Sequence, residues 1–87
     1  MRHRADDNQH EIIDALRKMG VPVLVLSQVG GGCPDLMIYW HNKAYLLEVK
    51  TDKGELSKGQ KEFLDIWRGV VFIVRSVEEV IKLLECL

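Results

Sequence analysis

Two carboxylates and one lysine lie around a predicted β-hairpin, in positions from which they can act on the same atom. The hairpin is predicted from "DLMIYW" (residues 35–40) and "AYLLEVK" (residues 44–50), which flank the polar His41-Asn42-Lys43. Glu48 and Lys50 are two residues apart, so they project from one face of a strand. A connection of two or four residues pairs Asp35 with Glu48 or Lys50 on that face, whereas three residues turn it away.

This combination of residue types suits the hydrolysis of a phosphodiester. Two neighbouring carboxylates repel one another, and a pKa rises unless a cation neutralises them. Mg²⁺ binds one or two carboxylates in many proteins and keeps its other positions for water and phosphate oxygens. A nearby ammonium can hold the attacking water or offset charge on the phosphate. We therefore expect Asp35, Glu48 and Lys50 to surround Mg²⁺ or Mn²⁺.

The elements that must position these residues are predicted in the order helix, three strands, helix, strand, helix. Capping-box spacing predicts the three helix starts, at Asn8–Glu11, Ser57–Gln60 and Ser76–Glu79. Besides the hairpin strands, "VPVLVLSQV" (residues 21–29) and "VVFIV" (residues 70–74) read as strands, the latter covered on both faces. A crossover from residues 44–50 to residues 70–74 makes those two strands parallel. We expect an α/β fold, a small mixed sheet with helices on both faces.

Composition predicts one domain over residues 1–87, with residues 1–6 loose. The formal net charge of −1 confines any nucleic-acid surface to a local patch. No apolar run is long enough for a membrane span, and Cys33 and Cys86 lack metal-type spacing. These features predict a cytoplasmic protein without a membrane partner. A chain this short can gain buried area by forming an oligomer.

The ordered motifs carry a resemblance to a known family. Pro34-Asp35 followed by "EVK" at residues 48–50 is similar to the motif of PD-(D/E)XK nucleases. The longer pattern "GGGCPDLMIYW…YLLEVKTDKGELSKGQKEFLDIW…VFIVRS" resembles the VRR-NUC family, the virus-type replication-repair nucleases. The resemblance implies a restriction-endonuclease-like αβββαβα core. It also implies a metal site formed by Asp35, Glu48, the main-chain carbonyl of Val49 and Glu11, with Lys50 and Gln60 as further catalytic residues.

Several of these residues have a structural explanation as well. Capping with Asn8 accounts for Glu11, and capping with Ser57 accounts for Gln60, which can serve both purposes. Ser57 clusters in the sequence with three lysines: Lys53, Lys58 and Lys61. This cluster is either a surface that binds nucleic-acid phosphates or a solvated helix face. Trp40 and Trp67 are expected in the core or an interface rather than as base-stacking platforms.

The function expected from the resemblance is that of a metal-dependent DNA endonuclease. Its substrate would be branched DNA, such as a Holliday junction, or duplex DNA. A homodimer would supply one site for each strand. The alternative is a nucleic-acid-binding or recruitment module on the same fold with little or no catalysis. Compact length fits a stand-alone phage or bacterial protein.

Overall fold

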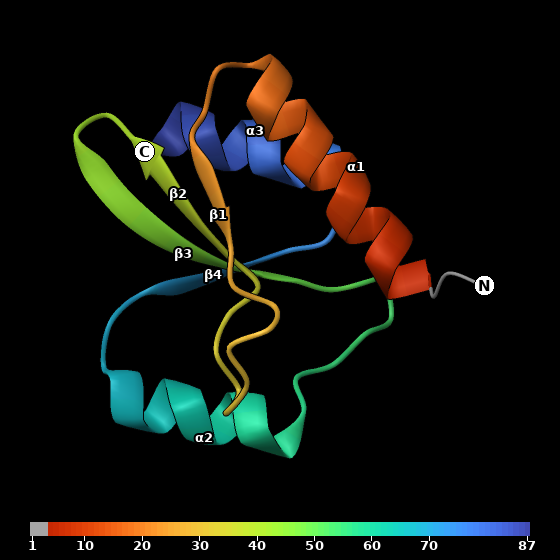
Figure 1. The fold of residues 1–87 in the computed structure, drawn as a ribbon, viewed down its shortest axis with the longest axis vertical. Helices are drawn as coiled ribbons and strands as arrows, with labels where there is room; N and C mark the ends of the chain where they lie inside the picture. Colours follow the sequence, from red (N-terminus) through yellow and green to blue (C-terminus); the bar gives the residue numbers. More distant parts are fainter. Residues whose placement is uncertain (1–3) are drawn as a thin grey trace.

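The computed structural model describes residues 4–87, which fold into a four-stranded sheet and three helices. The elements are α1 (Arg4–Lys18), β1 (Val23–Val25), β2 (Leu36–Trp40), β3 (Lys43–Val49), α2 (Lys58–Trp67), β4 (Val71–Val74) and α3 (Val77–Cys86). In Figure 1, α1 and α3 lie on one side of the sheet and α2 lies on the other. The predicted order of elements and the mixed α/β class are confirmed.

The sheet has the strand order β1-β2-β3-β4. Strands β1, β2 and β3 are antiparallel neighbours, and β4 runs parallel to β3. The parallel pair is separated by α2, as expected for a crossover connection, because parallel strands cannot be joined by a tight turn. Both edges of β3 are therefore paired, with β2 on one side and with β4 on the other.

The main core fills the space between the sheet and the helices α1 and α3. Strand residues alternate between the two faces, so Leu36 and Ile38 of β2 point into this core. They pack with a stripe of α1 side chains at helical spacing, including Ile12 and Leu16. Trp40 is half-buried against this core, and its indole Nε1 donates to the Leu84 carbonyl at 3.1 Å. Trp40 is thus a core residue.

The opposite face of the sheet is covered much less. None of the ten residues of α2 is fully buried, and Ile73 of β4 remains 40% exposed on this side. The prediction that "VVFIV" is covered on both faces is therefore wrong. Apolar composition alone does not show whether a facing helix reaches a strand, and β4 lies at the edge of the sheet.

Three local predictions also need correction. Helix α1 begins at Arg4, so residues 4–6 are not loose; residues 1–3 lie outside the described residues. Asn8 therefore lies inside the helix and does not cap it with Glu11, because its amide is used in tertiary contacts. The first strand is confined to Val23–Val25, shorter than residues 21–29, since the chain leaves the sheet in a turn.

The other two helix starts follow the prediction more closely. Ser57 and Gln60 form the full capping box of α2. At α3, the Ser76 side chain accepts from the amide of Glu79 at 3.1 Å. The Glu79 carboxylate, however, accepts from the amide of Arg75 at 2.9 Å, so the reciprocal half of that capping box is missing.

Candidate active site

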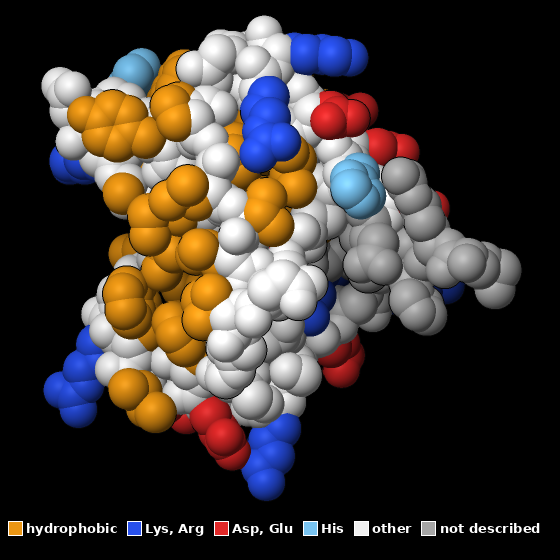
Figure 2. Space-filling model, viewed as in Figure 1, with side chains coloured by type: hydrophobic (Ala, Val, Ile, Leu, Met, Phe, Trp, Pro, Cys, Tyr) orange, Lys and Arg blue, Asp and Glu red, His pale blue; other side chains and the backbone are white. Residues whose placement is uncertain are grey.

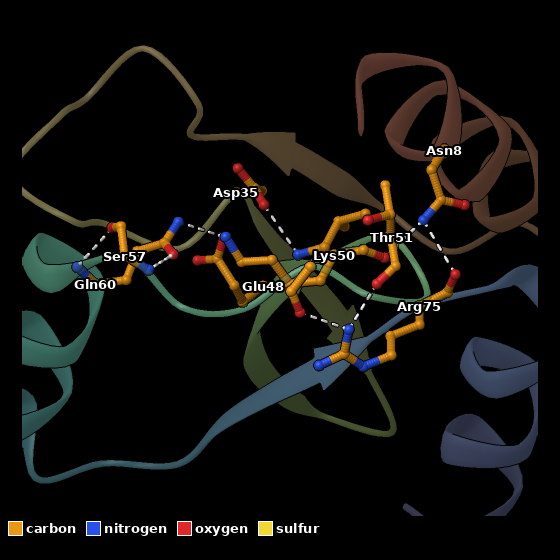
Figure 3. Close-up of polar contacts among 10 residues, drawn as sticks. Asn8, Asp35, Glu48, Lys50, Thr51, Ser57, Gln60 and Arg75 are labelled. Atoms are coloured by element: carbon orange, nitrogen blue, oxygen red, sulfur yellow. Dashed lines mark hydrogen bonds and ion pairs between the residues drawn. The ribbon is translucent and has the colours of Figure 1, made fainter. Parts of the chain in front are cut away.

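The hairpin register places Asp35 beside Glu48. The connection consists of His41 and Asn42, both with positive φ (47° and 68°), as a type I′ turn requires. Leu36 pairs with Leu47, so the next position of each strand sets Asp35 opposite Glu48. One Asp35 carboxylate oxygen accepts from the amide of Val49 at 2.9 Å, which fixes its side chain against β3 (Figure 3). The even-numbered connection, left open by the sequence, brings the two acids to one face.

Glu48 is a buried acid, only 3% exposed, on the α2 side of the sheet. Burial raises the pKa of Glu48 to about 8, aided by its hydrogen bond with Asp35 and by the negative charge of Asp35; Lys50 acts in the opposite direction. The Lys50 Nζ lies 4.0 Å from the Glu48 Oε1. One ammonium at that distance does not balance the negative charge that both acids would carry when ionised.

Gln60 links Glu48 to the start of α2. Its Nε2 donates to the Glu48 Oε1 at 3.0 Å, while its Oε1 accepts from the amide of Ser57 at 2.8 Å. The Ser57 hydroxyl in turn accepts from the amide of Gln60 at 3.2 Å. The capping role and the contact with the site therefore coexist in one side chain (Figure 3).

A contact between two glycines holds α2 close to the acids. A Cβ atom on Gly32 would lie 2.1 Å from the carbonyl oxygen of Gly59, in the first turn of α2. Gly32 also has a φ of +78°, which favours glycine over other residues. The glycine turn before Pro34 thus packs against α2 with no room for a side chain, and this packing sets the position of Gln60.

Asp35, Glu48, Lys50 and Gln60 line one open cleft, with a volume of about 360 Å³. Val49 lines it too, so the structure brings together five of the residues predicted for the site. Its other walls are Gln9, Val25, Ser27 and Gln28. The Gln9 Nε2 donates to the Ser27 hydroxyl at 2.7 Å and so joins α1 to the turn after β1.

Sequence reasoning missed these polar wall residues. The only sequence signal for Ser27 and Gln28 is their position at the end of an apolar run, where polar residues are common in any loop. Gln9 carries no pattern that separates it from the other polar residues of α1.

Glu11 does not join this cleft. It lines a neighbouring cleft of about 220 Å³ together with Asp7, Asn8, Thr51, Asp52 and Arg75. One helix can line two sites because residues two apart on a helix face different directions. The α1 residue that reaches the cleft of Asp35 and Glu48 is Gln9.

The predicted nucleic-acid-binding residues lie on the surface near α2. Ser57, Lys58 and Lys61 are exposed at the N-terminal part of α2, and Lys53 is exposed in the loop before it. None of them lines the cleft of Asp35 and Glu48. Their exposure is compatible with either phosphate binding or solvation.

Two carboxylates with one main-chain oxygen are a suitable donor set for a hard divalent cation. In residues 4–87 the structure contains no group of three or more His, Cys, Asp or Glu side chains that could hold a metal ion. A cation at Asp35 and Glu48 would therefore rely on water or phosphate for its remaining ligands, which is usual for Mg²⁺. Burial, and then the neighbouring Asp35, raise the pKa of Glu48, so a cation at this position would compete with a proton.

The mixed four-stranded sheet with helices on both faces agrees with a small α/β nuclease-like core. The family model of the VRR-NUC domain matches residues 26–78, more than half of the chain and all of the motifs after α1. The chain therefore belongs to the VRR-NUC family, which implies a nuclease-type function. No curated protein and no solved structure gives a significant match to the chain.

Among the helices of residues 4–87, the structure contains none that is both long and apolar enough to span a membrane.

Proposed function

We propose that the protein is a Mg²⁺- or Mn²⁺-dependent DNA endonuclease. The observation that carries this proposal is the pairing of Asp35 with Glu48 on one sheet face, with the Lys50 ammonium 4.0 Å from Glu48. Asp35, Glu48 and the main-chain carbonyl of Val49 are the groups that would hold the cation. When bound, the cation neutralises the carboxylates, lowers the pKa of a bound water and offsets charge on the phosphate.

Lys50 and Gln60 have separate roles in this proposal. The ammonium of Lys50 orients the attacking water and stabilises negative charge as the P–O bond breaks. Gln60 holds the Glu48 carboxylate through a hydrogen bond of 3.0 Å and is itself held by the α2 cap. Gln60 lies in the first turn of α2, and Lys50 lies just beyond the end of β3 with its amide bonded to the Val74 carbonyl, which favours a fixed geometry for the reaction.

DNA is the proposed substrate, contacted by the exposed cluster of Lys53, Ser57, Lys58 and Lys61. These residues lie on the loop and helix that follow Lys50, so a phosphate backbone held there would pass beside the cleft. The proposed substrates are branched DNA, such as a Holliday junction, and duplex DNA.

A homodimer formed through the open face of the sheet is the assembly we propose. Figure 2 shows hydrophobic side chains gathered in a band on the left side of the molecule, between the hairpin and α2. The apolar face, as we call it, consists of six exposed residues: Leu24, Tyr39, Ile66, Trp67, Val70 and Ile73. Exposed apolar area of this kind favours association. Ile73 pairs with Glu48 in the sheet register, so a two-fold dimer would place both active sites at the same interface.

The decisive experiment is a cleavage assay on a supercoiled plasmid, a linear duplex and a four-way junction. The purified protein should cut only with Mg²⁺ or Mn²⁺, and Glu48→Ala and Lys50→Ala should cut far more slowly than the parent, with a residual rate that is still measurable in Lys50→Ala. Variants that cut as well as the parent would show that the site is assigned wrongly. Salt-dependent binding without strand scission by the parent would indicate the alternative function, a nucleic-acid-binding module.

A further inference from the structure

The side chain of Asn8 joins the ends of the two parallel strands. Its Nδ2 donates to the carbonyl of Lys50 at 2.8 Å and to the carbonyl of Arg75 at 3.0 Å (Figure 3). The Lys50 amide also donates to the Val74 carbonyl at 3.0 Å. Both main-chain polar groups of Lys50 are thus engaged just beyond the end of β3, by α1 on one side and β4 on the other.

The guanidinium of Arg75 holds the segment that comes directly after Lys50. Its Nη1 donates to the carbonyls of Thr51 at 2.6 Å and Gly54 at 2.7 Å, with a longer contact to Asp52 at 3.4 Å. Hydrogen bonds from a charged donor are about twice as strong as those between neutral groups. The loop is therefore wrapped around one half-buried cation.

We propose that Asn8 and Arg75 are positioning residues that fix the backbone from which the Lys50 ammonium reaches the active site. This inference rests on the proposed nuclease function. A lysine side chain has four rotatable bonds, so the position of its Nζ depends on how firmly its main chain is held. Misplacement of a reacting group by about 1 Å can reduce a rate about 10²-fold. Neither Asn8 nor Arg75 is among the residues that line the cleft of Asp35 and Glu48.

The same loop connects Lys50 to the capping box of α2, so Arg75 also stabilises the main chain that leads to Gln60. The loop residues between β3 and α2 are held at one end by the guanidinium and at the other by the Ser57–Gln60 box. Loss of Arg75 should therefore loosen both groups that approach Glu48. Asn8 contacts only the main chain of Lys50 and of Arg75, so its loss should affect Lys50 more than Gln60.

Direct contact with DNA is a poor explanation for Arg75. The cleft that contains it is also lined by the carboxylates Asp7, Glu11 and Asp52, which would repel a phosphate. Its Nη1 is already occupied by main-chain carbonyls. Asn8 is similar, because both hydrogen bonds of its amide nitrogen go to the protein backbone.

The test compares Asn8→Ala and Arg75→Ala with two matched controls, Asp14→Ala and Arg17→Ala, which change exposed residues of α1. Single-turnover cleavage of supercoiled plasmid is measured in Mn²⁺, and binding of a fluorescent duplex is measured in Ca²⁺ over a range of salt. We expect each positioning variant to lower the cleavage rate about 10–100-fold, the usual range for residues that orient a catalytic group. The duplex affinity and its salt dependence should stay at parental values, and the controls should behave as the parent.

A double-mutant cycle separates positioning from general destabilisation. In the Lys50→Ala background, Asn8→Ala should reduce the residual rate no further, because Asn8 acts through Lys50. An equal loss in both backgrounds would overturn the inference, as would parental cleavage by Asn8→Ala. If the slope of log duplex affinity against log salt concentration falls by about one in Arg75→Ala, Arg75 instead contacts a DNA phosphate.

The failure of the inference and the failure of the proposed function give different results. If the parent does not cut, or if Lys50→Ala cuts like the parent, the nuclease proposal fails. If Lys50→Ala cuts far more slowly than the parent while both positioning variants cut normally, only the positioning role fails. Thermal unfolding is recorded for every variant; if Arg75→Ala does not fold, Asn8→Ala and the charge-conserving Arg75→Lys decide the question.

Discussion

The Nε2 of Gln60 donates to the Oε1 of Glu48 at 3.0 Å, while the same side chain completes the cap of α2. This relationship ties the start of a helix to a buried acid that comes from a different element. A hydrogen-bond donor favours the charged form of the carboxylate and limits its orientation. Gln60 therefore supports the ionised Glu48 that a cation would require.

Replacement of Gln60 can separate these two roles. Gln60→Glu keeps an acceptor for the Ser57 amide but places a second carboxyl group next to Glu48, whereas Gln60→Ala removes both interactions. We expect both variants to lose about 10–100-fold in cleavage rate. At about pH 5 the free energy of unfolding should fall only in Gln60→Ala, by about 1 kcal/mol, as it does when other helix caps are removed. Normal cleavage by Gln60→Glu would show that Gln60 serves α2 alone.

The contact between Gly32 and Gly59 should tolerate no added side chain. In Gly32→Ala the new Cβ would overlap the Gly59 carbonyl, so α2 must shift and carry Gln60 away from Glu48. Gly31→Ala is the matched control, because Gly31 also has a positive φ (+64°) but has open space around it. We expect the control to lose about 1–2 kcal/mol from backbone strain. Gly32→Ala should lose more and should also cut about 10²-fold more slowly. Equal losses in both variants would contradict a packing role.

Much of this site could be predicted from sequence because it depends on local rules. The two-residue spacing of Glu48 and Lys50 predicts that both face one side, and the capping box of Ser57 and Gln60 marks the start of α2. The roles of Asn8 and Arg75 could not be predicted, because their partners lie 42 to 67 residues away for Asn8 and 21 to 24 for Arg75. Capping-box spacing at Asn8 was misleading for the same reason: tertiary hydrogen bonds use its amide.

The stability of the metal-free protein should depend on pH through Glu48. Its folded-state pKa is raised from 4.5 to about 8, so the folded protein binds the proton more tightly than the unfolded chain. The contribution to stability is fully present below pH 4.5 and is lost as the pH rises through about 8. Each pKa unit corresponds to about 1.4 kcal/mol, so the free energy of unfolding should fall by a few kcal/mol over this window. Urea unfolding in EDTA from about pH 5 to pH 8 measures this, and Glu48→Gln should lack most of the slope.

Metal binding should release a proton for the same reason. With a pKa of about 8, Glu48 is mostly protonated at pH 7 in the metal-free protein, and a cation requires the carboxylate. Calorimetric titration with Mn²⁺ at pH 7, in buffers of different ionisation enthalpy, should therefore show net release of protons on binding. The release should diminish as the pH is raised above about 8, where Glu48 becomes ionised, and this series is measured with Mg²⁺, which stays in solution at alkaline pH. Parental Mn²⁺ affinity in Glu48→Gln would place the cation elsewhere.

The apolar face should control the oligomeric state. Ile66 is the most exposed of its residues, at 80%, so a charge there removes little packing within one subunit. We expect the parent to have a mass of about 20 kDa in solution, twice the 10.0 kDa of one chain. Ile66→Glu should reduce this mass to that of one chain, with little change in thermal stability at low protein concentration.

Met19→Glu is the matched control, because Met19 is also exposed (43%) but lies beyond the end of α1, outside the apolar face. Light scattering after gel filtration measures both variants. A parent of about 10 kDa would rule out the dimer, and dissociation by Met19→Glu alone would place the interface elsewhere.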